Sequence, residues 1–258
     1  YKDFTQRNDK QDHFKTNSFT QNGEQNNFES NNSEQNDNEQ NYVASNNFMG
    51  NDTIQNDATQ EEEAYSQRVR EANKEQAVNF SNEGKVYFSE GSYEKAIESF
   101  TNAINLDNTV VSYYVNRGSA YGQLNRLTEA IEDYTSAIEL DENFSMAYLQ
   151  RGVAYYFQGK YELSLNDMNK TIEVDSQIDM AYVYRAKIYE IQNKVEEALN
   201  DYIRATQINS ANPLGYEGKG NMYYKQGRFE EALAELSQAI NLNNQVFAYY
   251  LSRAKIYE

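Results

Sequence analysis

Few residues in this chain have side chains suited to acid–base or nucleophilic chemistry. The sequence contains no Cys and a single His, His13, which lies in a strongly polar segment. A side-chain nucleophile needs an activating base beside it, and zinc sites are built mainly from thiolate and imidazole ligands. The sequence therefore predicts no catalytic centre and no metal site, and we expect a protein that is not an enzyme and needs no cofactor.

Two other features resemble sites but are better explained by structure. Acidic pairs such as Glu129 with Glu132 recur at regular intervals, as expected for the solvated face of a helix rather than for a calcium or acid–base site. Gly218 and Gly220 fall inside a predicted helix, whereas a phosphate-binding loop follows a strand.

The charge balance excludes two classes of partner. The net charge is −17 and the sequence has no basic run, so we expect no nucleic-acid binding. An acidic chain is repelled by an anionic lipid surface, and no stretch approaches the roughly 20 apolar residues of a membrane span. The lack of Cys fits a reducing compartment, so we expect a cytoplasmic location.

The strongest signal in the sequence is an internal repeat of 34 residues that begins at Ala77. Repeat positions 4 and 11 are aromatic, positions 8, 20 and 27 are small, and position 24 is large. The residues at position 4 are Phe80, Tyr114, Tyr148, Tyr182, Tyr216 and Tyr250. Those at position 8 are Gly84, Gly118, Gly152, Ala186, Gly220 and Ala254. Those at position 24 are Phe100, Tyr134, Met168, Tyr202 and Leu236.

This spacing predicts two antiparallel helices in each repeat. Positions 4, 8 and 11 share one helix face, as do positions 20, 24 and 27 on a second helix. Small residues are expected where the two helix axes approach closely. A single hairpin is too small to fold alone, so neighbours must stack into one continuous core. The predicted repeats are 77–110, 111–144, 145–178, 179–212, 213–246 and a partial repeat 247–258.

The residues before the repeats have a different composition. Residues 1–62 are rich in Asn and Gln with isolated aromatic residues, and such a segment cannot bury enough apolar surface to offset its conformational entropy. We predict that residues 1–62 are disordered and that residues 63–76 form a helical lead-in to the repeats.

The repeated residues resemble those of the tetratricopeptide repeat family. One departure recurs: the family usually has Pro at position 32, where this chain has Asn, Glu or Ser. The resemblance implies an all-α, right-handed superhelical solenoid of antiparallel helix pairs. It also implies that the first helices line a concave groove that binds a peptide or helix of a partner protein.

Repeat positions 2, 5, 6, 9, 12 and 13 of these first helices, the last including Ile191, are expected to point into the groove, and the candidate binding residues are drawn from them. They are Asn116, Met146, Leu149, Gln150, Val153, Tyr156, Met180, Val183, Tyr184, Lys187, Asn221 and Tyr224. An alternative interpretation is a targeting or regulatory module of a larger enzyme or co-chaperone, because the array stops inside its sixth repeat.

Chaperone-binding relatives hold an acidic C-terminus with a set of Lys, Arg and Asn residues. In the first three repeats those positions hold Ser81, Lys85, Asn116, Met146 and Gln150, so only Asn116 matches. We therefore do not expect heat-shock chaperone tails as partners. An amide row, Asn82, Asn116 and Gln150, is either a peptide-backbone site or an ordinary solvated face.

Charged residues also recur, with a basic residue at position 7 and an acidic one at position 23. We predict a structural ladder in which position 23 pairs with position 7 of the next repeat, for example Asp133 with Arg151. The other interpretation is a charged stripe that binds a ligand.

Overall fold

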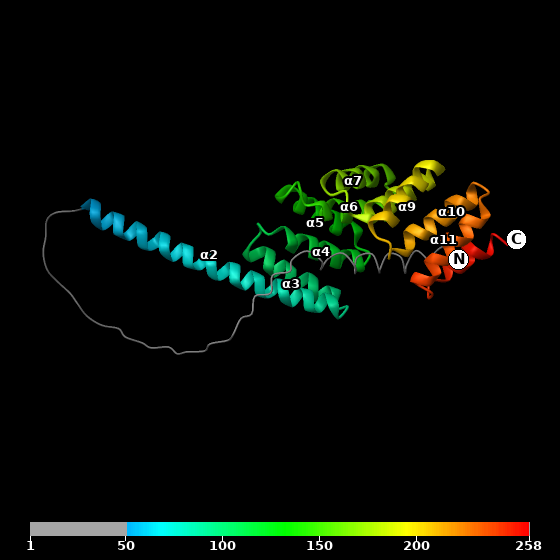
Figure 1. Ribbon diagram of the computed structural model, residues 1–258. Helices are drawn as coiled ribbons and strands as arrows, with labels where there is room; N and C mark the ends of the chain where they lie inside the picture. The colour runs from blue at the N-terminus through cyan, green and yellow to red at the C-terminus, as the bar shows by residue number, and fades with distance from the viewer. Residues whose placement is uncertain (1–50, 258) are drawn as a thin grey trace.

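The computed structural model describes the backbone of residues 51–257 and the side chains of residues 60–257. These residues form eleven α-helices and no strand, and the helices stack one after another as antiparallel pairs (Figure 1). The predicted all-α solenoid is therefore confirmed. His13 and residues 1–50 of the segment expected to be disordered lie outside the described residues.

In repeats two to five the first helix has 13 residues and the second has 14. The helices are α2 (Asn51–Ser89), α3 (Tyr93–Leu106), α4 (Val111–Gln123), α5 (Leu127–Leu140), α6 (Ser145–Phe157), α7 (Tyr161–Val174), α8 (Asp179–Ile191), α9 (Val195–Ile208), α10 (Pro213–Lys225), α11 (Phe229–Leu242) and α12 (Phe247–Ala254).

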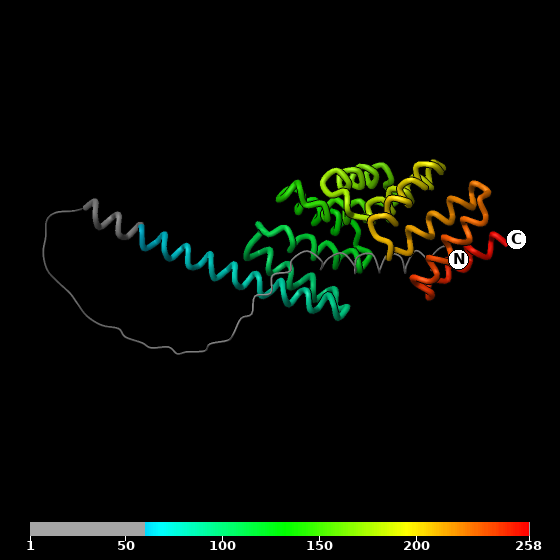
Figure 2. The backbone as a smooth tube through the Cα atoms, in the orientation of Figure 1, coloured from blue at the N-terminus to red at the C-terminus, as the bar shows by residue number. Residues whose placement is uncertain are grey.

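The first helix of repeat one is much longer than the others. α2 has 39 residues and contains the predicted lead-in 63–76 without a break before Ala77. It begins at Asn51, so residues 51–62, which we expected to be disordered, are helical in the structure. Figure 2 shows this helix extending away from the stacked hairpins.

In repeats one, two, three and five, the small residue at position 8 and the large residue at position 24 meet as the repeat predicts. The large residues at position 24 are at most 1% exposed, and the small residues at positions 20 and 27 are fully buried. A Cβ added at Gly84 would lie 2.7 Å from Phe100 Cε1, and one at Gly118 would lie 2.8 Å from Tyr134 Cε1. The aromatic ring therefore rests directly on the glycine backbone.

The turn inside each hairpin depends on one residue in the left-handed backbone region, at repeat position 15. These residues are Gly91, Asn125, Gly159, Asn193 and Gly227, with φ between 58° and 77°. Gly and Asn tolerate this conformation best. The following N–H then donates to the carbonyl of the position-11 Tyr, for example Lys160 to Tyr155 at 2.9 Å, which closes the helix end.

The turn between repeats shows why Pro is dispensable at position 32. Position 31 always holds Asp or Asn, and its side chain accepts a hydrogen bond from the backbone N–H two residues later. Examples are Asp141 with Asn143 at 2.9 Å and Asp175 with Gln177 at 2.9 Å. These side-chain turns fix the chain direction that Pro fixes elsewhere in the family.

The close approach at position 8 gives a test. We expect Gly118→Leu to lower the free energy of unfolding by about 3 kcal/mol, the upper end of the range for overpacking, because Tyr134 cannot move out of a filled core. Thr128→Leu, on the exposed surface of the same hairpin, should change it by less than about 0.5 kcal/mol. Urea denaturation followed by circular dichroism measures both, and equal effects would contradict this packing.

Candidate functional site

The candidate site is on the first helices α6, α8 and α10. Side chains at repeat positions 5 and 6 are largely buried there, whereas those at positions 2, 9, 12 and 13 are mostly half-buried or exposed. We call this second set the first-helix face. Its members are Met146, Tyr156, Phe157, Met180, Lys187, Glu190, Ile191, Leu214, Asn221, Tyr224 and Lys225.

Six of the twelve expected groove residues are not presented to a partner in this structure. Their side chains are at most 4% exposed: Asn116, Leu149, Gln150, Val153, Val183 and Tyr184. Five of them are at positions 5 and 6, which enter the core between repeats because successive first helices contact each other. The sixth, Val153 at position 9, belongs to the same core cluster as Leu149 and Tyr184. Two residues of the amide row, Asn116 and Gln150, are 4% and 2% exposed.

The other six expected residues belong to the first-helix face. Met146, Tyr156, Met180, Lys187 and Asn221 are half-buried, and Tyr224 is 40% exposed. Ile191, at groove position 13, is 49% exposed on the same face. Two aromatic residues of this face pack on the buried Tyr184. The ring centroids of Tyr156 and Phe157 lie 5.3 and 6.3 Å from that of Tyr184.

A polar cluster lies where repeat four meets repeat five. The Tyr202 hydroxyl donates to Glu190 Oε1 at 2.5 Å, and the Lys225 ammonium lies 3.3 Å from Glu190 Oε2. Burial raises the pKa of Tyr202 well above its ordinary value, and the Glu190 charge raises it further. Tyr202 therefore stays protonated and acts as a fixed donor to the carboxylate.

One sequence exception explains this cluster. Position 8 of repeat four is Ala186 rather than Gly, and the Tyr202 ring packs instead over Gly218 of the next repeat. A Cβ at Gly218 would collide with that ring. The shift carries the Tyr202 hydroxyl to Glu190 on the first-helix face. Ala186 and Gly218 were visible in the sequence as departures from the repeat, although we did not connect them.

An exposed apolar edge continues from this cluster to the hairpin turn of repeat five. The rings of Tyr224 and Phe229 lie 5.8 Å apart, and Phe229 is 51% exposed. Lys225 follows Tyr224 directly and has 39% of its side chain exposed. Apolar surface beside charged groups is the composition expected of a protein-binding surface.

The predicted charge ladder exists, but its pairing is different. In repeats two to five, each position-7 cation binds the acidic residue of its own repeat, not of the preceding one: Arg151 Nη2 and Nε each lie 2.9 Å from Asp167 oxygens. Arg151 Nη1 also donates to Thr135 of the preceding repeat at 3.2 Å. The predicted Asp133–Arg151 pair is therefore wrong, because the second helix returns to the level of position 7 of its own hairpin.

The same arrangement recurs along the array, with Arg117–Asp133 at 2.7 Å, Arg185–Asp201 at 2.7 Å and Lys219–Glu235 at 2.9 Å. The carboxylates of Asp133, Asp167 and Asp201 are at most 10% exposed. These ion pairs join the two helices of a hairpin, so they are part of the fold and do not form a stripe of free charges for a ligand.

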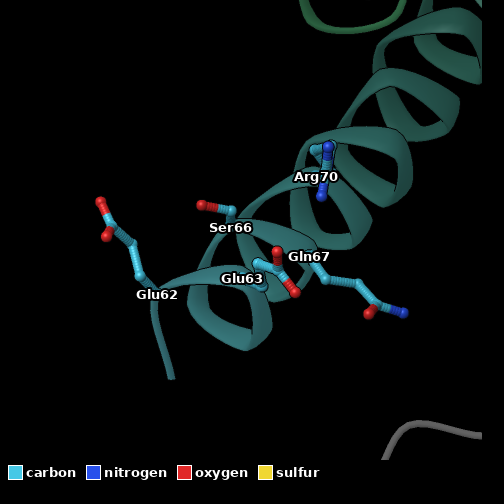
Figure 3. Close-up of a pocket in the computed structure, with 5 residues that line it drawn as sticks. All are labelled: Glu62, Glu63, Ser66, Gln67 and Arg70. Carbon is cyan, nitrogen blue, oxygen red and sulfur yellow. The ribbon is translucent and has the colours of Figure 1, made fainter. Parts of the chain in front are cut away.

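Other parts of the described chain offer weaker candidates. A hollow on α2 is lined by Glu62, Glu63, Ser66, Gln67 and Arg70, which lie on successive turns of a single helix (Figure 3). Among residues 60–257, no group of three or more acidic, His or Cys side chains is placed to hold a metal ion. None of the described helices is long and apolar enough to cross a membrane.

Sequence comparison identifies the repeat. A family model described as TPR repeat matches residues 84–125, 118–159 and 220–258. A second, described as tetratricopeptide repeat, matches residues 149–213. No curated protein matches this sequence.

Several solved structures have the same fold at low sequence identity. PilF of Pseudomonas aeruginosa is 15% identical with a TM-score of 0.66, and the match covers 72% of this chain and 84% of that one. YrrB, described as a TPR protein with an unusual peptide-binding site, is 20% identical with a TM-score of 0.55, covering 73% and 97%. The APC/C Cut9–Hcn1 assembly is 16% identical with a TM-score of 0.65, covering 71% and 36%.

The charge pairs give a stability test with a defined pH dependence. Arg151→Met should lower the free energy of unfolding by about 3 kcal/mol at pH 7, because it leaves a buried carboxylate without its partner. Burial already raises the pKa of Asp167 above its ordinary value, and losing Arg151 raises it further. A carboxyl whose folded-state pKa is raised favours the fold most near or below its unfolded pKa of about 4 and loses that contribution as pH rises.

The difference between parent and variant should therefore shrink as the pH is lowered from 7 to about 4. Lys170→Met is the control, because it removes an exposed pair with Glu173 and should cost less than about 1 kcal/mol at either pH. A loss in Arg151→Met that does not change with pH would show that the Asp167 charge is not its cause.

Proposed function

Because the chain belongs to the tetratricopeptide repeat family, we propose that it binds a segment of a partner protein on the first-helix face of repeats three to five. Arrays of this family generally act as non-catalytic protein-interaction modules. The solenoid supplies a rigid row of first helices, and the ligand is held by side chains on that row.

The observation that carries the proposal is the exposure of two apolar side chains, Ile191 and Tyr224, on the first-helix face. These side chains are 49% and 40% exposed beside Lys187, Asn221 and Lys225. Large apolar side chains at a polar surface gain most from a partner that covers them. Half-buried Met146 and Met180 on the same face can adapt to ligand shape.

A peptide or helix with an apolar anchor suits this face best. The anchor would cover Ile191 and Tyr224, while Asn221 and the two lysines would hydrogen-bond polar groups of the ligand. The peptide-binding site described for the structural neighbour YrrB supports a peptide as the class of ligand. A cytoplasmic location remains a prediction.

The same face would serve if the array were the targeting module of a larger enzyme or of a co-chaperone. A carboxylate clamp for chaperone tails has no support, because Asn116, the one matching residue, is 4% exposed. We therefore propose recognition through apolar anchors rather than through a terminal carboxylate.

The test uses peptides selected from a random display library against the full chain. The double variant Ile191→Glu with Tyr224→Glu should weaken binding of the selected peptides by at least about tenfold, since each introduced charge must be desolvated under the ligand. Fluorescence anisotropy measures the dissociation constant.

Leu163→Glu is the matched control, because Leu163 is 46% exposed but lies on the second helix α7. Peptides that bind the double variant as tightly as the parent, but lose affinity for Leu163→Glu, would place the site on the second helices. Circular dichroism confirms that each variant keeps its helices.

A further inference from the structure

The N-terminal half of α2 carries a surface that the repeats do not use. Residues 60–76 are exposed apart from half-buried Asn73, whereas Ala77, Ser81, Gly84 and Phe88 are buried against the array. Figure 2 shows this part of α2 leaving the stack. Single helices in water are marginally stable, so a helix of this kind gains from a partner along its length.

An apolar strip follows one side of the projecting helix. Tyr65 is 65% exposed and Val69 is 40% exposed, and Ala72 lies one turn further on. The spacings of four and three place these residues on one face. A helix that packed on this strip would cover the two largest exposed apolar side chains of the segment.

Charges of both signs lie along the same segment. Glu61, Glu62 and Glu63 precede the strip, and Arg68, Arg70 and Lys74 lie alongside or beyond it together with Glu71 and Glu75. Glu62, Ser66 and Arg70 are four residues apart and so line one side of the helix beside the strip (Figure 3). Neither Glu62 nor Arg70 forms an ion pair with any residue in the described part of the chain.

On the side of the helix that carries Glu62, Ser66 and Arg70, the order of charges is complementary to itself when the direction of the helix is reversed. Two copies of the segment in parallel would place acidic residues opposite acidic ones. Two antiparallel copies would place Glu62 of each opposite Arg70 of the other, and Tyr65 beside Val69. A two-fold axis near Ser66 would generate each of these contacts twice.

We propose that the projecting half of α2 pairs antiparallel with the same segment of a second copy of this chain. The contact is confined to a few helical turns and is small, so the dimer is weak and reversible. It leaves the first-helix face of both copies open. A dimer would hold two such faces together and raise the avidity for a partner that carries two binding segments.

The experiment is sedimentation analysis of the full chain over a range of concentrations up to several hundred micromolar. The parent should dimerise with increasing concentration. Glu62→Arg places two cations opposite each other in the dimer, and Arg70→Glu places two carboxylates opposite each other. Each variant alone should weaken dimerisation at least about tenfold.

An equimolar mixture of the two variants should dimerise again, because the cation introduced at position 62 of one chain then faces the carboxylate introduced at position 70 of the other. A merely destabilised helix would not be rescued in this way. Glu98→Arg, an equal charge change on the exposed surface of α3, should leave the parent dimer unchanged.

Three results would overturn the proposal. They are a parent that remains monomeric at every concentration, a dimer that both single variants retain, and a dimer that is lost only when residues 1–50 are deleted. Circular dichroism of each variant confirms that the array is folded, so that loss of dimerisation reports on the contact itself.

Discussion

The close packing of a large side chain against a small one, within the hairpin in every full repeat but the fourth, is the contact on which the rest of this structure depends. At Gly118 and Tyr134 the ring lies directly on the backbone of the facing helix, and both are buried. This contact sets the distance between the two helices of a repeat. It also returns the second helix to the level of position 7, so that Arg117 meets Asp133 of the same hairpin.

A change in that contact creates the most distinctive part of the candidate site. The Tyr202 ring packs over Gly218 of the next repeat, whereas the position-24 side chains of the other repeats pack over the position-8 Gly of their own hairpin. Tyr202 therefore crosses the repeat boundary and fixes Glu190, which in turn holds Lys225. A packing exception on the inside of the solenoid thus determines which polar groups stand on its surface.

The sequence predicted the hairpin core, because in a strict repeat the equivalent positions must meet the same packing requirement. Side-chain pairing across the second helix was not predictable from the period, since both the same-repeat and next-repeat pairings for Asp133 recur every 34 residues. The length of the turn between the two helices of a hairpin determines which of the two ion pairs forms.

The exposure of the candidate binding side chains was the other property that the sequence did not predict. Tyr184 and Leu149 have the types and positions of ligand-binding residues, yet they are 1% exposed because adjacent first helices touch. How deeply a side chain lies between two repeats depends on the inclination of one repeat to the next, which no local pattern encodes. The side-chain turns at position 31, such as that of Asp141, were present in the sequence and were missed because we looked for Pro one residue later.

The central claim is that a partner binds the first helices of repeats three to five, and methyl NMR spectroscopy tests it most directly. A selected peptide would be titrated into the full chain while the methyl groups of Met180, Ile191 and Leu163 are observed. We predict that Met180 and Ile191 shift on binding and that Leu163, on the second helix α7, does not. A shift at Leu163 with Met180 and Ile191 unchanged would contradict this account.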